Sequence, residues 1–236
     1  MTTTGKYIGI NQRVPFSVLD AAILHFLQEG NINKDDILAH MKEFTKGENR
    51  AQKATKYAWQ ILTRESKILN ELRKKVDQST YLNMSLRDRK ALVLCLISLT
   101  YPITYDLLVA LAAGFKVQSQ INKTFINQKI AAIYGSNRTM DIALDALLPM
   151  IIELDTIKRD KISLYSKTEK AIISNPFIQE LITYTDIKLS GSKSILLEDV
   201  SHRPWHMYFE VKPLKERKQA LLRYSEGVVG GGYLTI

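Results

Sequence analysis

The pattern Gly-x-Asn-Arg occurs twice, as Gly47-Glu48-Asn49-Arg50 and as Gly135-Ser136-Asn137-Arg138. A long helical pattern follows each one, so each Asn is predicted to cap a helix and each Arg to lie in its first turn. The free backbone N–H groups of a helix N-terminus attract phosphate. The two motifs therefore predict two places where the chain binds phosphate groups.

The distribution of charge points to the same chemistry. The 236-residue chain has a formal net charge of +9, and between positions 46 and 75 nine basic residues accompany only three acids. The helix predicted to begin near Asn49 has a polar, mostly basic side, formed by Lys53, Lys56, Gln60, Arg64 and Lys67. This concentration is typical of a phosphate-binding surface, although an ordinary solvated helix face has the same composition.

Other residues that could do chemistry lack the rest of a site. His202 and His206 are four apart, but Pro204 lies between them and no motif supplies further zinc ligands. The segment from Trp205 to Phe209 is interpreted as aromatic filling for the core. The glycine-rich stretch 227–233 lacks the Lys-Ser/Thr of a P-loop and reads as a flexible tail or a docking strand. The sequence therefore predicts no enzyme, no metal and no cofactor.

Composition bears on compartment and size. An apolar content of 45% is enough to bury a core without crosslinks, and the single cysteine, Cys95, lies in an apolar run without a disulfide partner. No signal-peptide pattern opens the chain, which favours a cytoplasmic location. The apolar run from Ala91 to Phe115 is interrupted by polar residues and Pro102, so two buried helices are predicted there and no membrane span.

Turn and cap residues divide the chain into three parts. Residues 1–78 have the plan of a helix-turn-helix domain: a helix from Pro15, a second capped by Asn33 and a third from Asn49. Residues 79–170 are predicted to form a second helical module, with Ser85 and Thr104 as caps of its first two helices. Residues 171–236 are expected to pack on that module or to bind a partner.

A charged hairpin is predicted near the end of the second module. Two β-prone stretches between Ile157 and Tyr165 flank a tip that carries Lys158, Arg159 and Lys161. The hairpin resembles the wing of a winged helix, and an ordinary exposed hairpin is the alternative. The predicted fold class is thus mainly α, with two helix-turn-helix or winged-helix-like modules, a small β wing and a mixed C-terminal segment.

The chain resembles the BrxA family of BREX phage-defence systems over about two-thirds of its length. The residues that carry the resemblance are Glu48-Asn49-Arg50, followed by Thr55, Ile61, Leu62 and Arg64, then a mostly helical middle and the 147–165 region. The resemblance implies a small, mostly helical, non-enzymatic DNA-binding protein that acts beside larger BREX components, which methylate host DNA and exclude phage. A broader likeness to the NusB-type helical fold would favour RNA as the ligand.

Together these features predict a protein that docks on duplex DNA, mainly through phosphate contacts. The residues expected to make contact are Asn49, Arg50, Lys53, Lys56, Gln60, Arg64, Asn137, Arg138, Lys158, Arg159 and Lys161. Two alternatives stay open. One is an adaptor that binds other BREX proteins through its aromatic Trp205 to Phe209 segment, and the other is an RNA-binding regulator.

Overall fold

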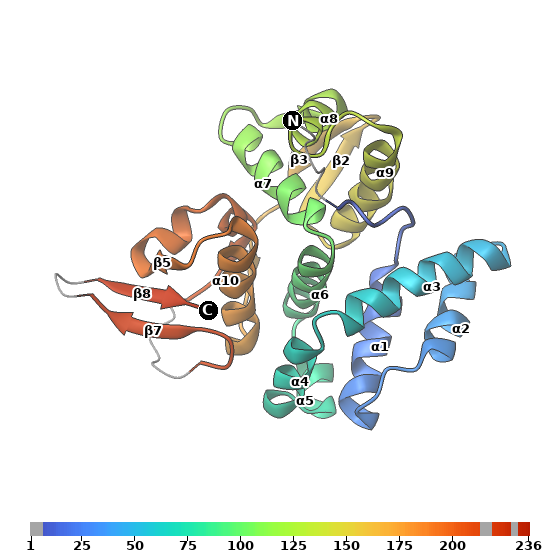
Figure 1. Ribbon diagram of the computed structural model, residues 1–236, viewed down its shortest axis with the longest axis horizontal. Coiled ribbons are helices and arrows are strands. Elements are labelled where there is room, and N and C mark those ends of the chain that lie inside the picture. The colour runs from blue at the N-terminus through green and yellow to red at the C-terminus, as the bar shows by residue number, and fades with distance from the viewer. Residues whose placement is uncertain (1–6, 213–218, 228–230) are drawn as a thin grey trace.

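The computed structural model describes residues 7–212, 219–227 and 231–236; within these ranges the fold is mainly helical, with three small sheets (Figure 1). The predicted mainly α class is confirmed. One hydrophobic core extends along the chain from Ile8 to Phe209, and a smaller cluster lies beneath the C-terminal sheet.

The first part of the chain folds into three packed helices. They are α1 (Phe16–Glu29), α2 (Lys34–Phe44) and α3 (Glu48–Thr63). Gly30 ends α1 in the left-handed conformation, and the Asn33 side chain caps α2, as predicted, by accepting from the N–H of Asp35. The side of α3 that faces the core is made of small residues and two larger aliphatic ones: Ala51, Ala54, Thr55, Ala58, Ile61 and Leu62. Small side chains let α3 pack closely, which leaves its other side in solvent.

The next three helices place a buried helix at the centre of the molecule. They are α4 (Ser66–Lys75), α5 (Gln78–Asn83) and α6 (Leu86–Thr100), and Ser85 caps α6 as predicted. All residues of α6 from Ala91 to Thr100 are buried, including Cys95, because α6 packs against α1, α3 and α10 (Pro176–Ser190). The predicted division at residue 78 stays a prediction, but α5 is tied to α1 by a 2.6 Å hydrogen bond from the Tyr81 hydroxyl to Asp20.

The apolar run from Ala91 to Phe115 forms two helices, as predicted. Between α6 and α7 (Ile103–Phe115) the chain turns by 113°, and among the described residues no single helix is long and apolar enough to cross a membrane. The predicted capping role of Thr104 is wrong. Pro102 occupies the N-cap position, because a proline without an N–H group fits a helix start, and Thr104 is fully buried within the first turn.

From α7 onward the elements follow the order helix, strand, helix, helix, strand, strand. After α7 come β1 (Gln120–Asn122), α8 (Lys123–Tyr134), α9 (Arg138–Glu153), β2 (Ile157–Lys161) and β3 (Leu164–Lys167). The strands form an antiparallel sheet in the order β1-β3-β2, so β2 and β3 make the predicted hairpin. Ile121, Ile157 and Tyr165 are buried and belong to the main core, which anchors the sheet to the helices.

The last part of the chain wraps around α10. Its short elements are β4 (Ala171–Ile172), β5 (Ser194–Leu196), η1 (Leu197–His202), η2 (Pro204–Tyr208), β6 (Phe209–Glu210), β7 (Arg223–Glu226) and β8 (Gly232–Thr235). Strands β4 and β6 pair in parallel, and β5, β8 and β7 form an antiparallel sheet in that order. Within the glycine-rich stretch, residues 228–230 lie outside the described ranges, whereas β8 is the central strand of this sheet (Figure 1).

Two buried carboxylates of α10 hold this part together. Asp186 accepts a 2.6 Å hydrogen bond from the Tyr105 hydroxyl of α7 and forms an ion pair with Arg203. Glu180 accepts hydrogen bonds from three consecutive backbone N–H groups, those of residues 220, 221 and 222, at 3.2, 2.5 and 2.8 Å. Buried charges are tolerated when hydrogen bonds satisfy them, so each carboxylate fixes one segment onto α10.

The segment from Trp205 to Phe209 lies in the core. Trp205 is fully buried and donates its indole N–H to the carbonyl of Ile182 at 3.0 Å, and Tyr208 and Phe209 are buried beside it. The interpretation as core filling is thus confirmed, and these side chains present no docking surface. His202 is exposed whereas His206 is buried, and burial lowers the pKa of His206 to about 4. In the described part of the chain, no three His, Cys, Asp or Glu side chains group as metal ligands.

Candidate nucleic-acid interface

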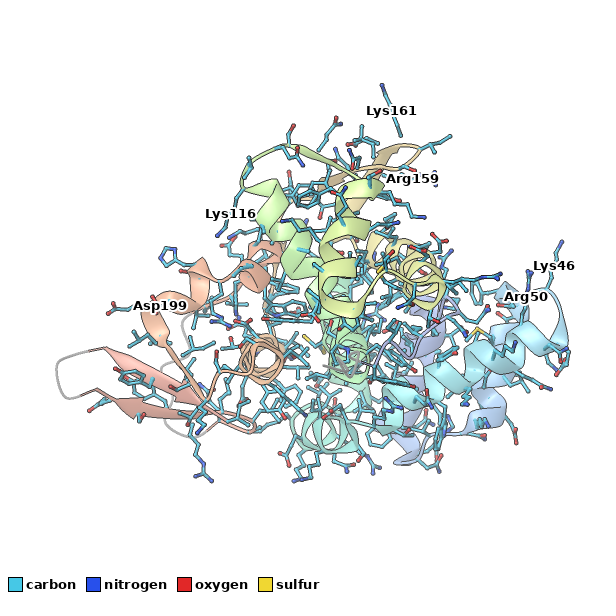
Figure 2. The ribbon with its side chains drawn as sticks, turned by 45° about the horizontal axis from the view of Figure 1, so that its top comes forward. Lys46, Arg50, Lys116, Arg159, Lys161 and Asp199 are labelled. Carbon is cyan, nitrogen blue, oxygen red and sulfur yellow. The ribbon has the colours of Figure 1, made fainter. Side chains whose placement is uncertain are left out.

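The exposed side of α3 carries a row of positively charged side chains. Arg50, Lys53 and Lys56 are all exposed, and within the described residues none of them forms an ion pair or a hydrogen bond through its side chain. They follow one another at intervals of three, which places neighbouring Cβ atoms about 5–6 Å apart on the helix surface. Figure 2 shows Arg50 at the outer corner of the molecule, beside Lys46 of the α2–α3 turn. This face can attract a polyanion.

The structure overturns the predicted capping role of Asn49. Gly47 is the N-cap residue of α3 and adopts a φ of 94°, whereas Asn49 is an exposed residue of the first turn. Glu48 begins the helix, because its carboxylate is favoured by the helix dipole and pairs with Lys42 at 3.0 Å. The hydrogen bond from Lys42 also lowers the pKa of Glu48. A carboxylate thus lies in the first turn of α3, where it is paired with Lys42 and accepts from the Gln52 amide, and the cationic side chains of α3 are the candidate anion-binding groups.

Gln60 and Arg64 have contacts inside the molecule. The Tyr101 hydroxyl donates a 2.8 Å hydrogen bond to the Gln60 side-chain oxygen, and Arg64 donates to the carbonyl of Thr100 at 3.3 Å. The Arg64 guanidinium also lies over the rings of Tyr7 and Tyr101, 5.6 and 5.8 Å from their centroids. Both predicted site residues thus hold α3 against the α6–α7 corner, which leaves Arg50, Lys53 and Lys56 as the unengaged part of the predicted group.

At the second motif Asn137 caps α9 as predicted. Its oxygen accepts from the N–H of Met140 at 2.9 Å, and its amide nitrogen lies 3.3 Å from the carbonyls of Tyr134 and Gly135. Asn137 therefore has local partners for both its oxygen and its nitrogen. Arg138 is exposed in the first turn, as expected.

Acidic residues accompany Arg138 on α9. Asp141 and Asp145 are both exposed on this helix; Asp141 accepts from the Asn127 amide at 3.4 Å, and Asp145 pairs with Lys123. These carboxylates reduce the positive potential of the second helix entrance. The surface around Arg138 is thus less suited to phosphate than the α3 face.

The β2–β3 hairpin carries the remaining predicted residues at the edge of the molecule. Lys158, Arg159 and Lys161 are exposed, and Figure 2 shows Arg159 and Lys161 extending away from the body of the protein. Lys158 lies 4.0 Å from Asp160, and the Arg159 Nε donates to the carbonyl of Lys161 at 3.3 Å. The hairpin and the α2–α3 corner lie on separate parts of the surface, so the structure does not join the two predicted groups into one patch.

The structure adds two residues to the candidate interface. Lys46 is exposed in the turn before α3, and Trp59 is 39% exposed on α3, one turn after Lys56. The spacing of three between Lys56 and Trp59 in a helix without other apolar residues on its outer side was the sequence signal for this tryptophan.

Comparison with protein-family models, with curated proteins and with solved structures finds no match to this chain.

Proposed function

We propose that the protein is a non-enzymatic DNA-binding protein that holds duplex phosphates on the exposed face of α3. The observation that carries this proposal is the group Arg50, Lys53 and Lys56, three exposed cations without a partner among the described residues. Like charges at this spacing repel one another, and a polyanion that neutralises them releases its own counterions. Phosphate contacts give affinity without reading bases, so weak sequence preference is expected.

The arrangement of helices supports a mode of docking. Helices α1 to α3 have the plan of a helix-turn-helix domain, in which α3 would be the helix that enters the groove. The order from α7 to β3, with its antiparallel sheet, supports the proposal that this unit acts as a winged helix, in which the β2–β3 hairpin would be the wing. We propose that Arg138, Arg159 and Lys161 of this second unit make a weaker, additional phosphate contact.

The likeness to the BrxA family suggests the biological process in which the protein acts. The residues that carry this likeness are Glu48-Asn49-Arg50 and those up to Arg64. We propose on this ground that the protein acts as a DNA-binding component of a BREX-type phage-defence system. The adaptor alternative has to use another surface than the buried Trp205 to Phe209 segment.

Fluorescence anisotropy with a labelled duplex of arbitrary sequence, across a salt series, tests the proposal. Affinity should fall with salt with a log–log slope of about −0.9 per neutralised phosphate, and the triple variant R50E/K53E/K56E should abolish binding at moderate salt. A matched control is K34E/K75E/K193E, which makes the same change in net charge at three exposed lysines elsewhere. This control should keep most of the affinity.

Three results would count against the proposal. Equal losses in the two triple variants would mean that net charge alone attracts DNA. Stronger competition by a structured RNA than by unlabelled duplex would favour the RNA-binding regulator. Absence of binding to either nucleic acid at low salt would favour the adaptor.

A further inference from the structure

The two tryptophans of this chain are in opposite environments. Trp205 is fully buried, its ring lies 5.3 and 5.5 Å from those of Tyr105 and Phe209, and its N–H has a backbone acceptor. Trp59 is 39% exposed, and within the described residues its ring has no aromatic or cationic partner and its N–H no acceptor. The backbone carbonyl of Trp59 accepts a 2.7 Å hydrogen bond from the Thr63 hydroxyl, which does not engage the ring. Among the described residues, the Trp59 ring thus lacks the aromatic and hydrogen-bond partners that Trp205 has.

Arg50, Lys53 and Lys56 form a cationic stripe on α3, and aromatic rings lie on both sides of it. Trp59 lies one turn from Lys56 on one margin of the stripe. On the other margin, Tyr57 packs edge-on against Tyr101 at 6.1 Å, and Tyr7, which is 61% exposed, lies under the Arg64 guanidinium. Cations that alternate with exposed aromatic rings are typical of surfaces that bind unpaired nucleotides: the cations follow the phosphates and the rings stack on bases.

Whether a tryptophan ring on this surface can stack on a base depends on whether that base is paired. In a continuous duplex, neighbouring base pairs cover both faces of every base, so a tryptophan ring cannot stack on one. An unpaired base exposes its face and gains from stacking on an aromatic side chain. We propose that Trp59 is a stacking platform for an unpaired base, so that the α3 face prefers DNA in which single-stranded bases adjoin phosphates held by Lys53 and Lys56. This inference rests on the proposed binding of DNA at α3.

The test compares two DNA ligands of one sequence, a continuous duplex and a duplex with a central gap that exposes unpaired bases. Wild type, W59A and W59F are titrated with each by anisotropy. We expect wild type to prefer the gapped DNA and W59A to lose roughly 5-fold more affinity for the gapped DNA than for the continuous duplex. W59F should keep most of the preference, because phenylalanine also stacks.

The emission of Trp59 gives an independent measurement. Unlabelled gapped DNA should quench the fluorescence of wild type, and W59F should show almost no change, since the buried Trp205 lies away from the α3 face. Because Trp59 is partly exposed and its ring has no specific partner in the described ranges, W59A and W59F should fold, which circular dichroism and the Tm can check.

The outcomes separate the two proposals. Suppose that wild type binds both DNAs, and that the W59A substitution lowers the two affinities equally or leaves both unchanged. The preference for gapped DNA is then intact, so the stacking proposal is wrong while DNA binding at α3 stands. If quenching is absent although gapped DNA is bound, the stacking proposal also fails. If R50E/K53E/K56E binds DNA as tightly as wild type, the site is not α3 and both proposals fail together.

Discussion

At the entrance to α3 and at the entrance to α9, the same four-residue pattern leads to different local structures. Gly47 is the N-cap of α3 and Asn49 is exposed in the first turn, whereas Asn137 itself is the N-cap of α9. The surroundings differ as well. At the entrance to α3, Glu48 is paired with Lys42, and three cations have no partner among the described residues; α9 carries two aspartates after Arg138. The neighbouring charges therefore decide which entrance is suited to phosphate.

The structural feature that the two helix entrances share is a glycine with a positive φ. Gly47 has φ 94° and ψ 124°, and Gly135 has φ 80° and ψ 150°. Both conformations lie in a region that residues with a Cβ atom rarely adopt. The common function of the pattern is thus a sharp change of chain direction before a helix, and the Asn and Arg that follow are used as each location permits.

The largest expected difference between the two entrances concerns DNA affinity. Reversal of Arg50, Lys53 and Lys56 should weaken binding on the order of 100-fold, whereas reversal of Arg138, Arg159 and Lys161 should weaken it on the order of 10-fold. The reason is that Glu48, beside the first group, is already paired with Lys42, whereas the Asp141 carboxylate lies on α9 near Arg138. Anisotropy at two salt concentrations measures both. A larger loss from the second variant would move the main contact to the unit from α7 to β3.

A smaller effect should be common to both entrances. Substitution of Gly47 or Gly135 with Ala is expected to lower the free energy of unfolding by about 1–3 kcal/mol each, because alanine is strained at these φ and ψ values. Space is not the cause: a Cβ atom at Gly47 would meet nothing within 4 Å, and one at Gly135 only the Asn137 amide at 3.7 Å. Urea unfolding measures the loss, with S136A as the control. An unchanged stability in either variant would contradict the shared role.

The smallest expected effect separates the two asparagines. N137A should cost about 1 kcal/mol of unfolding free energy, since the N–H of Met140 loses its acceptor, while N49A should cost less than about 0.5 kcal/mol. N137D keeps an acceptor at the cap and should recover most of the loss. Equal costs for N49A and N137A would show that Asn49 has a structural role that its exposed position does not suggest.

Local signals made the helices predictable. Asn33, Ser85 and Asn137 cap helices as expected, because a cap depends on atoms two or three residues away. The apolar run that contains Cys95 was also interpreted correctly as buried helix. These features require only the nearby sequence.

Contacts between distant residues limited the prediction of the site. Gln60 seemed free on the helix surface, but its partner Tyr101 is 41 residues away in sequence. The start of α3 at Glu48 depends partly on Lys42 of the preceding helix, which is why the predicted cap at Asn49 is wrong. For the same reason the sequence did not show that α6 packs against both α1 and α10.

The contact between Glu180 and the backbone of residues 220–222 has a consequence for how this chain folds during synthesis. Until those residues leave the ribosome, the Glu180 carboxylate lacks three of its donors, and a buried charge without donors is unfavourable. Helices α1 to α9 can pack while translation continues, whereas α10 can reach its final environment only after about 40 further residues have been added. The nascent protein should therefore assemble helices α1 to α9 first and add α10 and the C-terminal sheet last.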